Sequence, residues 1–192
     1  MRDMRKLYPH DKVLKHTLIR LVPNFVRPNH LTGLRLFLIP FVVYFILIQN
    51  YKIGLPLFAI AALTDMMDGS LARLRKQITE WGILWDPIAD KILIGSVVII
   101  LIARDLHPFF GVTIISLEAI FILGALHLRR IGKRALPTFY TKSKMVFQAI
   151  AVGLLLLSLA MHAGWLFSLA NGFFTLAILF AVVSLISHGL SL

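Results

Sequence analysis

The sequence predicts an all-α integral membrane protein with six transmembrane helices, preceded by an N-terminal amphipathic interfacial helix. Hydrophobic residues make up 58% of the 192 residues and the mean hydropathy is +0.84, which exceeds the usual apolar content of a soluble domain. Apolar runs close to membrane-spanning length recur along the chain. The net charge is +11, but the basic residues bracket the apolar runs instead of forming one basic face. This distribution indicates membrane topology and argues against nucleic-acid binding.

The interfacial helix is predicted over residues 10–25. Its apolar residues recur at helical spacing: Val13, Leu14, Leu18, Leu21 and Val22. The other side of the helix carries Lys12, Lys15, His16 and Arg20. A basic amphipathic helix of this kind lies in the membrane interface and favours anionic lipid. A solvated tail helix is the alternative.

We expect a single membrane domain over residues 1–192, with a six-helix bundle at 32–187. The predicted spans are 32–49, 53–71, 82–103, 109–128, 138–161 and 165–187. Asn29 or Thr32 is expected to cap the first span. Pro87 lies inside the third span, where it either kinks the helix or marks the start of its regular part.

Basic residues predict the orientation of the bundle. Eighteen of the twenty Lys and Arg residues fall on one side of this topology, and only Lys52 and Arg104 fall on the other. Because basic loops stay in the cytoplasm, both termini are expected on the cytoplasmic face of the inner membrane.

Four of the nine acidic residues form a pattern in the second and third spans: Asp65, Asp68, Asp86 and Asp90. Residues three and four apart share a helix face, so two antiparallel helices would bring the four carboxylates together. Carboxylates inside apolar spans are costly unless a cation pairs with them. Hard oxygen ligands favour Mg²⁺, Mn²⁺ or Ca²⁺, and the absence of cysteine argues against zinc. Two divalent ions would balance the charge, an arrangement suited to displacement at phosphorus.

A buried ion-pair network is the structural alternative for these aspartates. It is disfavoured because the apolar flanks contain no matching set of basic residues. A divalent-cation channel or carrier is the non-enzymatic alternative, since acidic rings form cation paths. The outer halves of the spans are nearly all apolar, which disfavours a conduction path.

The full pattern reads Asp-x2-Asp-Gly-x2-Ala-Arg-x8-Gly-x3-Asp-x3-Asp from Asp65 to Asp90. At every fixed position it resembles the signature of the CDP-alcohol phosphotransferases. The resemblance implies an enzyme that moves a phosphoalcohol from a CDP-linked donor to an alcohol and releases CMP. It implies metal binding by the four aspartates, with Mg²⁺ or Mn²⁺ as the ions and Asp90 as the base. It also implies a homodimer, and places Asp68, Gly69, Ala72 and Arg73 beside the CDP diphosphate.

Two flanking segments bear on the acceptor. Residues 28–35 and 137–148 resemble those of bacterial phosphatidylglycerophosphate synthases and related cardiolipin synthases, so glycerol 3-phosphate is the leading acceptor and CDP-diacylglycerol the donor. Phosphatidylglycerol is the second candidate, and inositol phosphate or serine the third. Leu117-Glu118 departs from the Arg-Glu of many phosphatidylglycerophosphate synthases, which weakens the first assignment. Lys142, Lys144 and Glu118 are candidate acceptor-binding residues, and Glu118 could instead simply pair with a neighbouring base.

Overall fold

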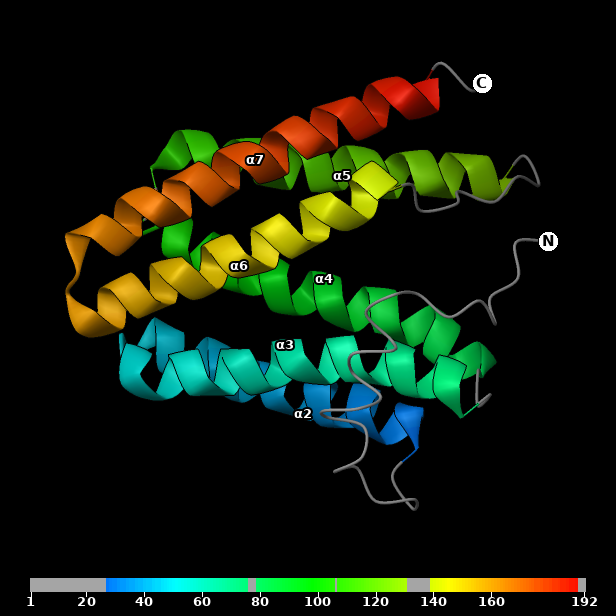
Figure 1. Ribbon diagram of the computed structural model, residues 1–192, viewed down its shortest axis with the longest axis horizontal. Coiled ribbons are helices and arrows are strands. Elements are labelled where there is room, and N and C mark those ends of the chain that lie inside the picture. Colours follow the sequence, from blue (N-terminus) through cyan, green and yellow to red (C-terminus); the bar gives the residue numbers. More distant parts are fainter. Residues whose placement is uncertain (1–26, 76–78, 106, 131–138, 190–192) are drawn as a thin grey trace. The chain divides into compact units, whose positions relative to one another are not determined.

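The structure, a computed structural model, describes residues 27–75, 79–105, 107–130 and 139–189. Within these ranges the chain forms six α-helices, shown in Figure 1: α2 (Pro28–Leu47), α3 (Tyr51–Leu74), α4 (Glu80–Ile102), α5 (Pro108–Arg130), α6 (Phe139–Met161) and α7 (Gly164–Gly189). The six predicted spans are confirmed as helices, with boundaries that differ by a few residues. The predicted interfacial helix at 10–25 lies outside the described residues.

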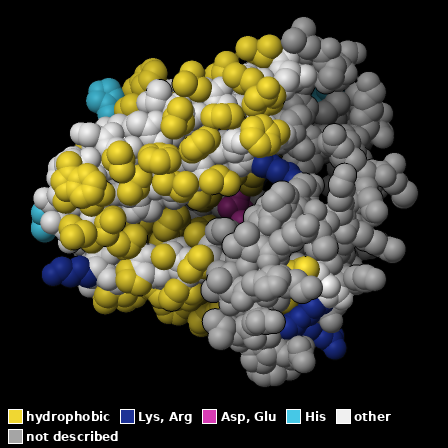
Figure 2. Space-filling view, viewed as in Figure 1, with side chains coloured by type: hydrophobic (Ala, Val, Ile, Leu, Met, Phe, Trp, Pro, Cys, Tyr) yellow, Lys and Arg dark blue, Asp and Glu magenta, His cyan; other side chains and the backbone are white. Residues whose placement is uncertain are grey.

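Four of the described helices are long and apolar enough to cross a membrane. They cover Pro28–Leu47, Tyr51–Ala72, Phe139–Met161 and Gly164–Ser187. A shorter apolar stretch, Pro108–Gly124, lies in α5. Hydrophobic side chains predominate on the described surface visible in Figure 2, as expected for helices that face lipid.

The described residues fall into two compact units that divide between Ile94 and Gly95, inside α4. In the first unit α2 and α3 lie side by side as an antiparallel hairpin (Figure 1), with Val42, Ile46, Phe58 and Ala61 buried. In the second unit α6 and α7 form another hairpin, and α7 also packs on α5. The buried side chains of this unit include Val152, Leu155, Phe174 and Ala177.

Both hairpins turn through a residue with left-handed backbone that is not glycine. After α2, Gln49 has φ 60°, and the amide of Asn50 donates to the carbonyl of Phe45 at 2.9 Å. After α6, His162 has φ 54°, and the amide of Ala163 donates to the carbonyl of Ser158 at 3.1 Å. These bonds are those of a Schellman motif, which satisfies the last carbonyls of a helix and reverses the chain. The tight turns hold each helix pair in register.

The start of α2 differs from the prediction in a way that matters for the site. The helix begins at Pro28, with Arg27 as its N-cap, because proline is favoured at the first helical position. The side chain of His30 accepts from the Arg27 amide at 3.4 Å. The expectation that Asn29 or Thr32 caps the helix is therefore wrong, and Thr32 lies one turn inside it.

The backbone also shows where Pro87 lies relative to the start of its helix. The α4 helix begins at Glu80, so Pro87 lies within it. The alternative in which the regular helix starts at Pro87 is wrong.

Candidate active site

Two polar side chains of α2 form the centre of the candidate site. Thr32 and Arg35 are three residues apart, so they point in similar directions from the helix. The Thr32 residue is 1% exposed and the Arg35 residue is fully buried. Buried charge inside an apolar helix needs acidic partners. Helix α3 supplies two for Arg35, and α4 supplies a carboxylate for Thr32.

The guanidinium of Arg35 lies between two of the aspartates of α3. Its Nη1 forms an ion pair with Asp65 Oδ1 at 2.8 Å, and its Nη2 donates to Asp68 Oδ2. Asp68 is almost completely buried, whereas the side chain of Asp65 is 41% exposed. From the sequence no matching set of basic residues is expected for these acids; the described contacts supply one base, Arg35 of the preceding helix, for two of them.

The hydroxyl of Thr32 connects α3 to α4. It donates to Asp86 Oδ1 at 2.6 Å and lies 3.4 Å from Asp68 Oδ2. One hydroxyl carries one proton, so the shorter contact with Asp86 is the stronger hydrogen bond. Asp68 and Asp86, eighteen positions apart in sequence, therefore meet at a single atom of α2.

A small polar wall stands beside Asp86. The hydroxyl of Thr79 donates to Asn29 Oδ1 at 2.8 Å and accepts from the amide of Gly82 at 3.1 Å. A methyl group on Gly82 would lie 3.3 Å from Thr79 Oγ1 and 3.4 Å from Asp86 Oδ2. Glycine at this position therefore lets α4 approach the Thr79 hydroxyl more closely than a larger residue would.

For the remaining predicted residues of this site the structure describes the helical position, and for some of them the burial. Asp90 follows Asp86 by one helical turn on α4 and is half-buried, which puts it on the same face. Ala72 is half-buried on α3. Gly69 and Arg73 lie on the helical backbone of α3, and their side chains are outside what the structure describes.

The second unit contains a separate charged pair. The ammonium of Lys144, on α6, donates to Glu118 Oε1 on α5 and lies 4.7 Å from the ring centroid of Phe121. The Lys144 side chain is 5% exposed and that of Glu118 is 25% exposed. Of the two alternatives for Glu118, pairing with a neighbouring base is what the structure has. Lys142, two residues earlier on α6, is exposed, so the two lysines do not face the same way.

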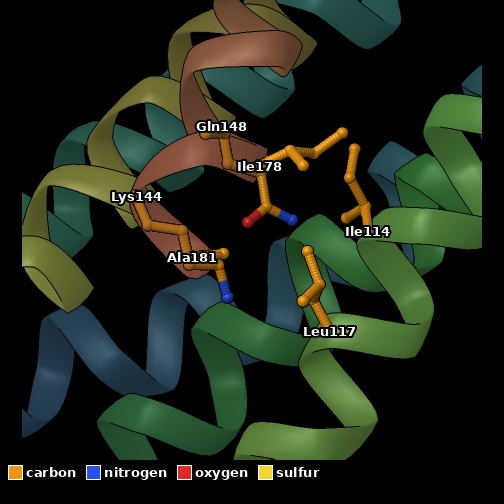
Figure 3. Close-up of a pocket in the computed structure, with 7 residues that line it drawn as sticks. Ile114, Leu117, Lys144, Gln148, Ile178 and Ala181 are labelled. Atoms are coloured by element: carbon orange, nitrogen blue, oxygen red, sulfur yellow. The ribbon is translucent and has the colours of Figure 1, made fainter. Parts of the chain in front are cut away.

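A small cavity lies next to this pair, between α5, α6 and α7. It is lined by Ile114, Leu117, Lys144, Gln148, Ala177, Ile178 and Ala181. Figure 3 shows the Gln148 amide pointing into the space between the apolar side chains. Gln148 is almost completely buried, so the cavity has a polar group in an otherwise mostly apolar lining.

Comparison with known proteins decides the family. The family model for CDP-alcohol phosphatidyltransferase matches residues 25–186, which is most of the chain and includes all four aspartates. The chain belongs to this family. It is therefore an integral membrane enzyme of the CDP-alcohol phosphatidyltransferase class, and this overrides the alternative of a cation channel or carrier.

Individual relatives of this CDP-alcohol phosphatidyltransferase divide between two activities. A CDP-diacylglycerol--glycerol-3-phosphate 3-phosphatidyltransferase of Rickettsia felis is 34% identical over 134 residues, which cover 68% of this chain and 74% of the relative. A probable cardiolipin synthase of Drosophila melanogaster is 40% identical over 99 residues, covering 51% of this chain and 31% of the relative. The human cardiolipin synthase is 38% identical over 119 residues, covering 61% and 38%. The matched segments span only about a third of the two cardiolipin synthases.

The family uses divalent metal ions, and the described acidic residues bear on whether this chain could hold them. No three acidic or histidine side chains in the described ranges already stand in an arrangement that could hold a metal ion. Their chemistry nevertheless fits, because the described contacts place three carboxylates against one guanidinium and one hydroxyl. This set carries excess negative charge on hard oxygen atoms, which are the ligands of Mg²⁺ and Mn²⁺.

Thr32 and Arg35 are the site residues that sequence reasoning missed in this phosphatidyltransferase. In the sequence analysis Arg35 contributes to the count of basic residues on the cytoplasmic side, and Thr32 is expected as a helix cap. The available signal was a threonine and an arginine three residues apart, followed by an apolar run. A polar pair on one face of a membrane helix is itself an indication of a functional site.

Proposed function

We propose that this chain is a phosphatidylglycerophosphate synthase, which transfers the phosphatidyl group of CDP-diacylglycerol to glycerol 3-phosphate and releases CMP. The observation that carries the proposal is the meeting of the signature carboxylates: Asp68 and Asp86, from different helices, share the Thr32 hydroxyl, and Asp65 joins Asp68 at Arg35. The similarity to the Rickettsia felis glycerol-3-phosphate enzyme over 74% of its length supports the choice of acceptor.

In this proposal Asp65, Asp68, Asp86 and Asp90 hold two divalent ions, Mg²⁺ or Mn²⁺. The ions, when bound, neutralise charge on the diphosphate of the donor and on the leaving CMP. Asp90 accepts the proton of the acceptor hydroxyl, whose oxygen forms a new bond to the phosphatidyl phosphorus while the bond to CMP breaks. Gly69 and Ala72 leave room for the nucleotide, and Arg73 binds phosphate oxygens through its fork of donors.

The acceptor phosphate is assigned to basic residues of the second unit, chiefly Lys142 and Lys144. The Lys144–Glu118 ion pair bears on this assignment. Lys142 is exposed whereas Lys144 is buried, so Lys142 is the more accessible of the two lysines and the candidate for first contact with the acceptor phosphate. Glu118 then holds Lys144 in place.

The membrane arrangement is part of the same proposal. Six spans, with both termini and the aspartates on the cytoplasmic side of the inner membrane, agree with the positions of the Lys and Arg residues. An interfacial helix at 10–25 and a homodimer complete it. The family match runs through both compact units, which supports a single functional domain.

The experiment is an acceptor panel with purified protein. In detergent with CDP-diacylglycerol and Mg²⁺, radiolabelled glycerol 3-phosphate should yield an organic-soluble product and an equal amount of CMP. EDTA should stop the reaction, and Mg²⁺ or Mn²⁺ should restore it. Asp86→Asn serves as the inactive control. Activity that persists in metal-free buffer would contradict the metal assignment.

Cardiolipin synthase is the second candidate, because the Drosophila and human cardiolipin synthases match at 40% and 38% identity and Leu117 replaces the arginine found in many phosphatidylglycerophosphate synthases. The same panel separates the two. If phosphatidylglycerol is consumed and cardiolipin appears while glycerol 3-phosphate stays unreacted, the leading assignment is wrong. Turnover of inositol phosphate or serine alone would favour the third candidates.

A further inference from the structure

The guanidinium of Arg35 is enclosed by protein but makes few hydrogen bonds. Arg35 is fully buried, and a guanidinium carries five N–H donors. Among the described residues, Nη2 donates to Asp68, and Nη1 forms an ion pair with Asp65 but no hydrogen bond. Nε likewise has no hydrogen-bond partner in this part of the chain. Leaving donors of a buried charged group without acceptors is costly, so the present pairing does not use all that Arg35 can bind.

The same guanidinium stands where divalent ions would need carboxylate oxygens. Arg35 contacts Asp65 and Asp68 directly, and both are signature aspartates. A positive charge in contact with two ligand carboxylates opposes a divalent cation that binds those carboxylates. Once the carboxylates are neutralised in another way, Arg35 needs a new anion, because an uncompensated buried charge is strongly destabilising.

We propose that Arg35 has two partners in turn. In the metal-free protein it is the counter-ion of Asp65 and Asp68, and after divalent ions bind it becomes a binding residue for the diphosphate of the nucleotide-linked donor. The inference rests on the proposed function, which supplies a diphosphate anion at this site. The planar fork of arginine suits phosphate oxygens as well as carboxylates, and Nε and Nη1 provide the donors. No covalent bond changes in this exchange of partners.

Two binding measurements test the exchange, and neither depends on turnover. Binding of Mn²⁺ without donor is measured by electron paramagnetic resonance, and binding of CDP-diacylglycerol at saturating Mn²⁺ without acceptor is measured by calorimetry. Arg35→Gln should bind Mn²⁺ about tenfold more tightly, because the competing charge is gone, and should bind CDP-diacylglycerol about tenfold more weakly. Arg104→Gln is the matched control, since it removes the same charge from an exposed position in the other unit, and it should change neither affinity.

The opposite signs of the two shifts distinguish the exchange from a purely structural role. If Arg35→Gln weakens both affinities or leaves Mn²⁺ binding unchanged, the inference is overturned. Should the glutamine variant fail to fold, Arg35→Lys decides: it keeps the charge but loses the fork. The lysine variant should bind Mn²⁺ like the wild type and CDP-diacylglycerol several-fold more weakly, and unchanged donor binding would overturn the inference.

Failure of this inference and failure of the proposed function give different experimental results. A wild-type protein that binds neither Mn²⁺ nor CDP-diacylglycerol overturns the proposed site and this inference together. A wild-type protein that binds both and turns over glycerol 3-phosphate, with an arginine variant that shifts both affinities in the same direction, overturns only the inference.

Discussion

Each of the two compact units buries a basic side chain against acidic ones, but the ratio of charges differs. In the first unit Arg35 is shared by Asp65 and Asp68, and Asp86 joins them through Thr32. In the second unit Lys144 faces Glu118 one to one, with the Phe121 ring as a further partner. The described acids of the first unit outnumber their one cation, whereas the described pair of the second unit is balanced. The ratio of acids to bases therefore distinguishes a site with surplus negative charge from a simple ion pair.

This difference favours the first unit for the divalent ions of the proposed function. A balanced pair already has its electrostatic partner, and a metal would have to displace the lysine to gain a single carboxylate. An acidic excess is unstable by itself and gains from a divalent cation. In the proposed function the first unit therefore holds the metal ions, and the second unit holds its helices together and contributes the proposed acceptor contacts.

The largest expected effect is the loss of turnover in Asp90→Asn. The amide cannot take a proton from the acceptor hydroxyl, so kcat should fall by a factor of about 10³ while CDP-diacylglycerol still binds. The measurement is CMP release together with donor affinity. Glu118→Gln is the corresponding change in the second unit. This variant should still release CMP, and its CMP release should still depend on Mg²⁺. Wild-type turnover in Asp90→Asn would refute the assignment of the base.

The next effect concerns stability and belongs to the second unit. Glu118→Ala leaves Lys144 buried without its carboxylate, which should lower the free energy of unfolding by about 3 kcal/mol. The double change Glu118→Leu with Lys144→Met removes both charges and should recover most of that loss, because a well-packed apolar pair avoids desolvation of ions. Thermal unfolding in detergent provides the readout.

The acceptor assignment adds a second readout to this pair. If Lys144 also contacts the acceptor phosphate, the double variant regains stability but keeps a raised KM for glycerol 3-phosphate. A double variant that regains stability and has the wild-type KM would leave Lys144 with a structural role alone.

The helices and the meeting of Asp68 and Asp86 could be predicted from the sequence, for physical reasons that differ. Hydropathy and length define a span, so the six helices were located to within a few residues. The spacing of Asp65, Asp68, Asp86 and Asp90 on two consecutive helices fixed their faces, and the contact of Asp68 and Asp86 with Thr32 agrees with it. Metal binding by these residues stays a prediction.

Other contacts could not be predicted, because an apolar helix does not reveal its inner face. The spacing of Thr32 and Arg35 indicates a polar face on α2, but the rest of the helix is hydrophobic almost all round, so no amphipathic pattern indicates which helices that face meets. The Lys144–Glu118 pair joins residues 26 positions apart on separate helices, a distance for which no local spacing rule exists. In both cases the interaction partners are determined by packing between helices, which the periodicity of one helix does not encode.

The smallest expected effect tests how closely the first unit is fitted around Asp86. In Gly82→Ala the new methyl group would lie 3.3 to 3.5 Å from oxygen atoms of Thr79, Asp86 and Asn29. Only Thr79 Oγ1 is closer than ordinary van der Waals contact, so this hydroxyl must move by a few tenths of an ångström. Because it belongs to the polar wall beside Asp86, kcat should fall about threefold, since small misplacements near reacting groups are costly. Gly95→Ala, on the same helix α4, meets nothing within 4 Å and should instead raise the free energy of unfolding by about 0.5 kcal/mol. Equal effects of the two substitutions on kcat and on unfolding would mean that Gly82 has no special relation to Asp86, and the polar wall would then be a feature of helix packing alone.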